Sequence, residues 1–313
     1  MAQSRMKDKG SNTVIVGQRI GRLGNQLFLL GNLLALHQAT GVRFSHAALR
    51  EYGLCFQGTC RDPLCRYPVL HGEADRSQHP VSGTFLVRAA VYVGMRCLDK
   101  IDSLTRLRGS VVSIDHRDTF DLSDPAFIDQ IISHKRTWLS GGWRFRYPTI
   151  RDSFLPAARQ FFALTEPYAS NVGTLLATAR GDGEILIGVH IRQTDFREHS
   201  GGRFYFTTPQ YAALMHQAAS LFPERKVRFL LVSDEDTENH DFGQLVCYRG
   251  SGVAVEDMYA LGGCDYIISS IASSFSLWPS VLYQVPSYRI SDPEQAVSIS
   301  DFKTTIEPWV LAG

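Results

Sequence analysis

An arginine and an aspartate follow an apolar run in the segment EILIGVHIRQTDF, where they could bind an anion. The run over residues 184–191 predicts a buried parallel strand. Ligands of open α/β sheets bind beyond the carboxyl ends of such strands, so His190, Arg192 and Asp195 are candidate site residues. The guanidinium of Arg192 can hold two phosphate oxygens and stabilise the charge that develops on a departing diphosphate. The alternative is a salt bridge between Arg192 and Asp195 that closes the loop.

A second group of polar residues ends the apolar run of FLLVSDED. The run predicts another strand of the same sheet, so Asp234 should lie at the same sheet edge as Arg192. Its carboxylate could accept hydrogen bonds from the edge of a guanine base. Asp234 and Asp236 also form a DxD pattern, which binds a divalent metal and a diphosphate in one large class of glycosyltransferases. An acidic turn in solvent is the third interpretation.

A serine-rich segment, SSIASSFS, joins a predicted strand to a predicted helix. Hydroxyl groups and unpaired N–H groups at a helix N-terminus form a site for an anion. Simple capping of the helix is the alternative, although capping needs only one serine. The serines are Ser269, Ser270, Ser273, Ser274 and Ser276.

A glycine-bearing turn, GQRIGRLGNQ, lies between the first predicted strand and the first predicted helix. Gly17, Gly21 and Gly24 follow the spacing G-x3-G-x2-G, which differs from the dinucleotide fingerprint G-x-G-x-x-G, and no acidic residue follows the second strand. These differences exclude a nicotinamide or flavin site. The glycines still permit close approach of a ligand to the backbone, and Asn25 and Gln26 supply amide groups.

Strands and helices alternate around these segments, as is typical of a doubly wound α/β domain. The second half has predicted strands over 184–191, 226–232 and 266–269, and predicted helices over 209–221, 255–261 and 273–285. The first half has predicted strands over 13–16, 42–44, 84–87 and 111–114, helices over 25–40 and 125–134, and irregular loops over 51–79. Helical sequence also runs over 151–179, with breaks near two prolines.

Composition limits the class of protein. The 313 residues suit two domains of roughly 150 residues each, and a net charge of +1 argues against a nucleic-acid-binding protein. The sequence predicts neither a signal peptide nor a membrane span, so we expect a cytoplasmic protein, with peripheral contact with the membrane left open. The six cysteines lack CxxC pairs, which favours free thiols over a zinc site.

Five segments, taken in order, resemble the α-1,2-fucosyltransferase family (glycosyltransferase family 11), within the wider fucosyltransferase superfamily. GRLGNQLF resembles the family's GGLGNQMF-type opening, and GGWRFRYP resembles its aromatic segment. GVHIRQTDF resembles its HxRRGDY segment, and LLVSDE resembles its SDD segment. SSFSLW, which follows VEDMYALGGCD, resembles its NSSFSWW ending. The matches extend from residue 21 to residue 282, which is most of the chain.

The resemblance implies a GT-B fold, an α/β architecture in which two Rossmann-like domains face each other across a cleft. Residues 1–165 would form the acceptor-side domain and residues 166–313 the domain that binds the GDP-sugar. The donor would be GDP-fucose, the reaction would invert the anomeric centre, and no cofactor or metal would be needed. The acceptor would be an oligosaccharide or a glycoconjugate, and no nucleic acid would bind.

The resemblance also assigns roles to residues of the site. Arg192 would assist the departure of GDP, and Asp195 is a candidate base that could instead orient Arg192. His190 and Asp234 would contact guanine. The full set of donor-binding residues would be Gly24, Asn25, His190, Asp234, Ser273, Ser274, Phe275 and Ser276.

The chain departs from the family pattern at several positions. Gln193 replaces the second arginine of HxRR, Thr194 replaces a glycine, and Leu277 replaces a tryptophan. These changes concern the acceptor and the linkage more than the donor. The leading hypothesis is fucosyl transfer from GDP-fucose to a sugar hydroxyl, for which the resemblance implies O-2 of a galactoside. The alternatives are another fucosyl linkage, a metal-dependent DxD glycosyltransferase, and an inactive protein that binds a nucleotide sugar.

Overall fold

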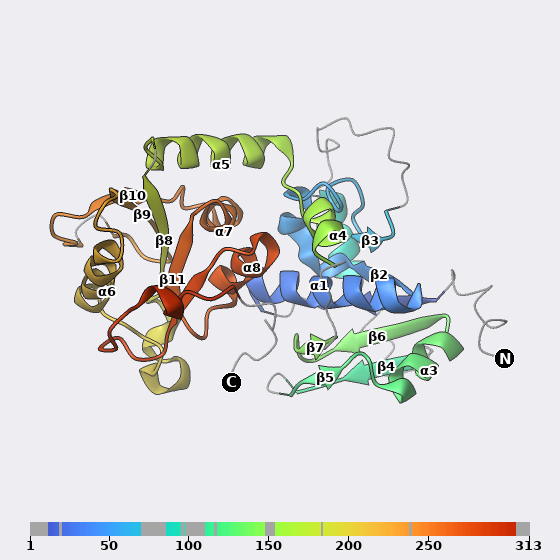
Figure 1. Cartoon of the computed structure of the whole chain (residues 1–313). Helices are drawn as coiled ribbons and strands as arrows, with labels where there is room; N and C mark the ends of the chain where they lie inside the picture. Colours follow the sequence, from blue (N-terminus) through green and yellow to red (C-terminus); the bar gives the residue numbers. More distant parts are fainter. Residues whose placement is uncertain are drawn as a thin grey trace. The chain divides into compact units, whose positions relative to one another are not determined.

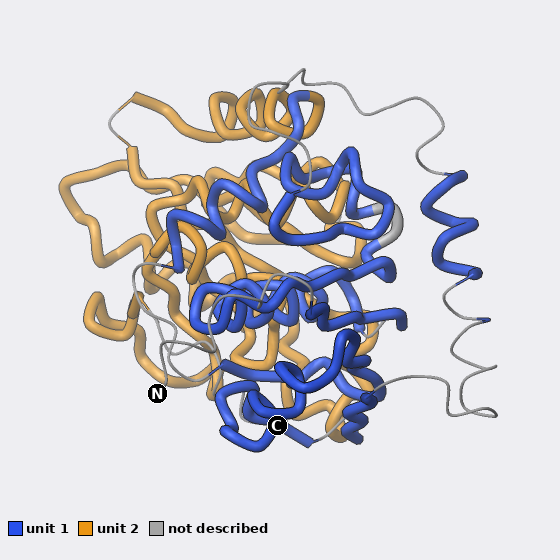
Figure 2. The backbone as a smooth tube through the Cα atoms, turned by 90° about the vertical axis from the view of Figure 1, so that its right-hand side faces the viewer, with its two compact units in different colours: residues 1–166 blue, residues 167–313 orange. Residues whose placement is uncertain are grey.

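The structure, a computed structural model, describes residues 12–18, 21–69, 86–94, 97, 110–115, 118–147, 154–182, 184–237 and 240–304. The chain divides into two compact units, residues 1–166 and 167–313, which Figure 2 colours separately. Within the described residues, each unit contains a five-stranded sheet that is mostly or wholly parallel, and helices accompany both sheets (Figure 1).

The sheet of unit 1 has the strand order β3-β2-β1-β6-β4, in which β3 is antiparallel to β2 and the other neighbours are parallel. Its strands are β1 (Thr13–Val16), β2 (Arg43–His46), β3 (Arg66–Tyr67), β4 (Ser110–Ser113) and β6 (Arg136–Ser140). A separate pair consists of β5 (Phe120–Asp121) and β7 (Phe145–Arg146). Its helices include α1 (Leu23–Thr40), the 3-10 helix η2 (Ala47–Leu54), α3 (Pro125–Ser133) and α4 (Phe154–Phe161).

Helix α1 is buried on all sides over its first fourteen residues except at Asn25, as expected for a helix that is apolar all round. It ends at Gly41, whose backbone is left-handed with φ 73° and whose N–H bonds to the carbonyl of His37 at 2.7 Å. This geometry favours glycine because a Cβ is disfavoured there.

The sheet of unit 2 has the strand order β10-β9-β8-β11-β12, and all its neighbours are parallel. Its strands are β8 (Ile185–Ile191), β9 (Val227–Ser233), β10 (Val246–Arg249), β11 (Tyr266–Ser270) and β12 (Ser287–Ile290). The helices are α5 (Glu166–Ala179), α6 (Thr208–Ser220), α7 (Ala254–Gly262) and α8 (Ser274–Tyr283). Short 3-10 helices are η3 (Asp195–Arg197), η4 (His199–Gly202) and η5 (Ile299–Asp301).

The two faces of β8 are covered by different helices. Its odd-numbered side chains join one hydrophobic core with residues of α6, including Tyr211 and Leu214. On the opposite face, a Cβ added to Gly188 would lie 2.6 Å from Leu261 Cδ2 of α7. Because His190 has the same parity as Gly188, its side chain lies on the face that α7 covers.

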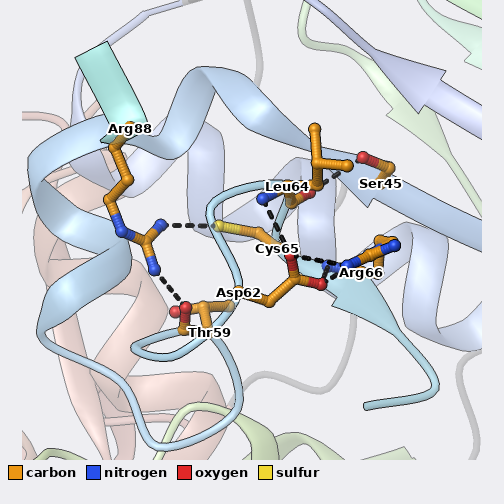
Figure 3. A network of polar contacts seen from close by, with 7 residues as sticks. All are labelled: Ser45, Thr59, Asp62, Leu64, Cys65, Arg66 and Arg88. Atoms are coloured by element: carbon orange, nitrogen blue, oxygen red, sulfur yellow. Dashed lines mark hydrogen bonds and ion pairs between the residues drawn. The ribbon is translucent and has the colours of Figure 1, made fainter. Parts of the chain in front are cut away.

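The prediction of a strand over 84–87 is wrong where the structure describes it, because residues 86–94 form a helix. A buried guanidinium ties this helix to the loop that follows η2 (Figure 3). Arg88 is 1% exposed, donates to Cys65 Sγ at 3.2 Å, and also bonds to the carbonyl of Thr59. In the same loop, the Asp62 carboxylate accepts from the backbone N–H groups of Leu64 and Arg66. Such tertiary contacts are invisible in a β-like sequence run.

Five further strands, β5, β6, β7, β10 and β12, were absent from the sequence prediction. Much of the segment 51–79 expected to be irregular is described, and it contains part of η2 as well as β3. Apart from the 3-10 helices, which were not predicted, the other elements agree with the prediction to within about three residues at their ends, and α4 and α5 are separate helices over the segment 154–179.

The six cysteines are free thiols, and four of them are buried. Within the described residues, none of the helices is long and apolar enough to cross a membrane.

Candidate functional site

Three strand ends meet at one edge of the sheet of unit 2, as the alternation of strands and helices predicted. Strand β8 is paired with β9 on one side and with β11 on the other, with Ile191 opposite Ser233 and Ser269 opposite His190. The residues that follow these strands therefore share the carboxyl edge of the sheet. This edge is where ligands bind in open α/β sheets.

Arg192 is held by Asp195 at this edge. Its Nε lies 2.9 Å from Asp195 Oδ1 and its Nη2 lies 2.7 Å from Asp195 Oδ2, a two-point ion pair. The guanidinium also lies 4.5 Å from the centre of the Phe196 ring. The salt bridge considered as an alternative is thus present. A guanidinium has five N–H donors, so this pair leaves other donors of Arg192 for an anion.

Asp234 fixes the loop that carries Arg192. One carboxylate oxygen accepts from the backbone N–H of Gln193 at 2.9 Å and of Thr194 at 3.4 Å, and the other accepts from the Thr194 hydroxyl. The carboxyl end of β9 therefore holds the loop after β8. The contact between Asp234 and guanine stays a prediction, and no motif in the sequence indicated the role of Thr194.

The side chain of Gln193 lies away from Arg192. It is 3% exposed and donates to the carbonyl of Phe206, a residue of the core that packs on α6. Successive side chains of an extended chain point to opposite faces, so position 193 is directed to the α6 face. Arg197, which follows in η3, forms a two-point ion pair with Glu235.

His190 is a buried, neutral hydrogen-bonding group. It is 4% exposed, its Nδ1 lies 3.0 Å from Ser273 Oγ, and its ring stacks on Phe275 with centroids 4.8 Å apart. Burial, assisted by the charge of Arg192, lowers the pKa of His190 to about 3. The imidazole is thus uncharged near neutral pH, and it can orient a ligand by hydrogen bonds but adds no charge.

The N-terminus of α8 is not capped by its serine. Ser273 occupies the N-cap position, yet its hydroxyl makes no cap bond and instead contacts His190. The hydroxyl of Ser276, in the first turn, is 1% exposed and has no partner among the described residues. Simple capping therefore does not explain these serines. An uncapped helix N-terminus with a buried, unsatisfied hydroxyl is suited to an anion.

In unit 1, Gly24 and Asn25 lie in the first turn of α1. Gly21 precedes them with φ 75°, and a Cβ there would lie 2.5 Å from Asn25 Nδ2. The amide of Gln26 donates to the carbonyl of Gly21 at 3.3 Å. The amide of Gln26 thus contacts the backbone of its own turn, and the donor-binding role of Gly24 and Asn25 stays a prediction.

Within the described residues, no three His, Cys, Asp or Glu side chains are grouped so that they could hold a metal. A cavity of about 560 Å³ lies beside β9 and β10, and no sequence motif indicated it. Its lining includes Leu231, which belongs to the hydrophobic core that packs on α6, together with His240, Phe242 and Arg249. The cavity therefore borders the face of the sheet opposite His190.

The fold is that of solved fucosyltransferases. A FUT1 mutant from Arabidopsis thaliana, in complex with GDP, matches with a TM-score of 0.55 and 14% identity over 93% of this chain and 74% of that one. NodZ from Bradyrhizobium matches with a TM-score of 0.53 and 17% identity over 91% and 97% of the two chains. POFUT1 in complex with GDP-fucose matches with a TM-score of 0.51 and 10% identity over 90% and 98%.

No protein-family model matches the chain, and no curated protein matches its sequence. The structural matches cover nearly all of the chain, and they confirm the predicted α/β fold class with two Rossmann-like domains of the GT-B type. Because the sequence identities to these solved structures are between 10% and 17%, the structural similarity shows the fold alone.

Proposed function

We propose that this chain is a fucosyltransferase that transfers fucose from GDP-fucose to a hydroxyl group of a glycan. The observation that carries the proposal is the uncapped N-terminus of α8, which contacts His190, two residues before Arg192, at the carboxyl edge of the sheet. A diphosphate fits this arrangement because helix amides, hydroxyls and a guanidinium are all donors. The solved structures that share the fold were determined with GDP or GDP-fucose in two of the three cases above.

In this proposal, Arg192 contacts the diphosphate and stabilises the charge that grows on GDP as the bond to fucose breaks. Asp195 holds Arg192 through both oxygens and acts as a positioning residue. His190 and Asp234 contact guanine, and Ser273, Ser274, Phe275 and Ser276 surround the phosphates. Residues 166–313 form the donor-binding domain and residues 1–165 the acceptor-side domain, and Gly24 and Asn25 remain candidate donor-binding residues.

For the finer activity we propose transfer to O-2 of a galactoside, without a metal or cofactor, on the cytoplasmic side of the cell. This rests on the motif order in the sequence. NodZ, which has the same fold, was solved as an α-1,6-fucosyltransferase, so the fold does not select the linkage.

The test is to incubate the chain with GDP-fucose, GDP-mannose and UDP-galactose, each with and without galactoside acceptors, and to determine the product linkage by NMR. We expect turnover of GDP-fucose alone and an α-1,2 linkage. Turnover of another donor would reject the proposal, whereas an α-1,6 product would reject only the linkage.

Two controls address the alternatives. EDTA should leave the rate unchanged, and a loss of rate that Mn²⁺ restores would support the DxD mechanism of Asp234 and Asp236. Binding of GDP without any donor turnover would indicate an inactive nucleotide-sugar-binding protein.

A further inference from the structure

A second arginine, Arg289, lies in the same row of the sheet as His190. Ser269 of β11 is in register with His190 of β8 on one side and with Arg289 of β12 on the other. Residues in register on neighbouring parallel strands point to the same face. Arg289 therefore lies on the face that carries His190, two strands away, or about 10 Å across the sheet.

The guanidinium of Arg289 contacts the turn that leads into α8. Its Nη2 donates to the carbonyl of Ile271, and the N–H of Ile271 bonds to the carbonyl of Ile290 at 3.0 Å. On the other side of the turn, the hydroxyl of Ser273 contacts His190. The turn 270–273 is thus held between β12 and β8. Of the contacts described above, the one made by Arg289 comes from a charged side chain.

Arg289 differs from the two other arginines at this edge in its charge partners. Arg192 is paired with Asp195, and Arg197 is paired with Glu235. In the described part of the chain, no carboxylate forms an ion pair with Arg289, and its one described hydrogen bond goes to a neutral carbonyl. Its positive charge is therefore not offset locally, and it adds to the positive end of the α8 dipole.

We propose that Arg289 is a positioning residue of the donor site, which fixes the turn 270–273 and supplies a second positive charge for the diphosphate. This inference rests on the proposed function, because it assumes that an anion binds at the N-terminus of α8. A diphosphate carries more than one negative charge, and Arg192, already paired with Asp195, balances only part of it. Arg289 acts from behind the turn, so it attracts the anion without touching the reacting atoms.

The experiment measures the Kd of GDP by calorimetry at about 0.05 M and about 0.5 M NaCl, with the wild-type chain, Arg289→Met and Arg289→Lys. We expect Arg289→Met to raise the Kd about tenfold at low salt and to reduce its salt dependence, because one attracting charge is lost. Arg289→Lys keeps the charge, so it should retain the wild-type salt dependence even if the Kd rises.

A matched control is Arg180→Met. Arg180 is similarly half-buried and pairs with Asp265 at the opposite, amino-terminal edge of the same sheet, where Asp265 also accepts from the N–H of Leu186. This variant should bind GDP as the wild type does at both salt concentrations.

The proposal is overturned if Arg289→Met weakens GDP binding by the same factor at both salt concentrations, since that result indicates a structural role alone, or if it leaves the Kd unchanged. If Arg289→Met does not fold, Arg289→Lys decides, and a salt dependence below that of the wild type would reject the proposal. Failure of the wild-type chain to bind GDP would instead reject the proposed function itself.

Discussion

At the scale of single residues, the ion pair between Arg192 and Asp195 determines what each can do. Both carboxylate oxygens of Asp195 accept from the guanidinium, and the guanidinium stays partly enclosed by Phe196. Asp195 is therefore better placed to orient Arg192 than to take a proton from an acceptor. The pair prepares the guanidinium before a ligand binds, which reduces the ordering cost of binding.

Asp195→Asn separates these two roles. Asn keeps one acceptor for Arg192, so we expect kcat to fall by about tenfold while the pH profile of kcat/KM keeps its shape. The measurement is the steady-state rate against pH for both proteins. Loss of the acidic limb of the profile, with a fall in rate of about a thousandfold, would show that Asp195 is the base.

Ser276→Ala tests the unsatisfied hydroxyl in the first turn of α8. No described hydrogen bond is lost in the free protein, so thermal stability should be unchanged or higher, whereas GDP binding should weaken about fivefold. Ser280→Ala is the control in the same helix, because its buried hydroxyl donates to the carbonyl of Val285 at 2.7 Å. That variant should lose stability and keep its affinity for GDP, and the reverse pattern would contradict the assignment.

At the scale of elements, strand β8 positions the site because both its faces are buried. The close approach of α7 at Gly188 fixes the strand on the face that carries His190. A side chain at position 188 would meet Leu261 Cδ2 at 2.6 Å and Cys264 Sγ at 3.0 Å. Position 188 therefore links the packing of α7 to the geometry of the candidate site.

We expect Gly188→Ala to lower the free energy of unfolding by about 1–3 kcal/mol because the core is overpacked. The matched control is Gly173→Ala in α5, where no atom lies within 4 Å of the added Cβ, so that variant should gain about 0.5–1 kcal/mol. Urea denaturation of both variants measures the difference. If Gly188→Ala and Gly173→Ala had the same free energy of unfolding, α7 would not pack closely on β8.

The elements of unit 2 could be predicted because apolar runs such as 184–191 and helical spacing such as 209–221 are local signals. The short edge strands β10 and β12 are less continuous in apolar character, and half of β12 is Ser287 and Arg289. The helix over 86–94 was missed because the contact that holds it, between Arg88 and Cys65, joins segments that are distant in the sequence.

The same limit applies to the site. The sequence indicated Arg192, Asp234 and the serines, since each follows an apolar run. It could not indicate that Asp234 holds the loop through Thr194, or that Ser273 bonds to His190 and leaves α8 uncapped. These contacts join strands that only the sheet order brings together.

At the scale of the whole molecule, buried histidines in both units make stability depend on pH. His46 ends β2 in unit 1, is fully buried, and neither ring nitrogen has a partner among the described residues. Burial lowers the pKa of His46 from 6.5 to about 4. Between these values the unfolded chain binds the extra proton, so the folded state loses stability as the pH falls below 6.5.

His46→Leu should remove this effect. Between about pH 7.5 and about pH 5, we expect the wild type to lose about 2 kcal/mol more stability than the variant does. Near neutral pH the variant should be close to the wild type in stability, because no described hydrogen bond is broken. Chemical denaturation at both pH values measures this, and parallel losses in the two proteins would contradict the assignment.

The central claim is that Arg192 binds and activates the diphosphate of GDP-fucose. The most direct measurement is the turnover of GDP-fucose by the wild-type chain and by Arg192→Ala, with folding of both checked by thermal denaturation. We predict that the wild type consumes GDP-fucose and that the variant, still folded, is slower by a factor of about 100–1000. Full activity of folded Arg192→Ala would contradict the account.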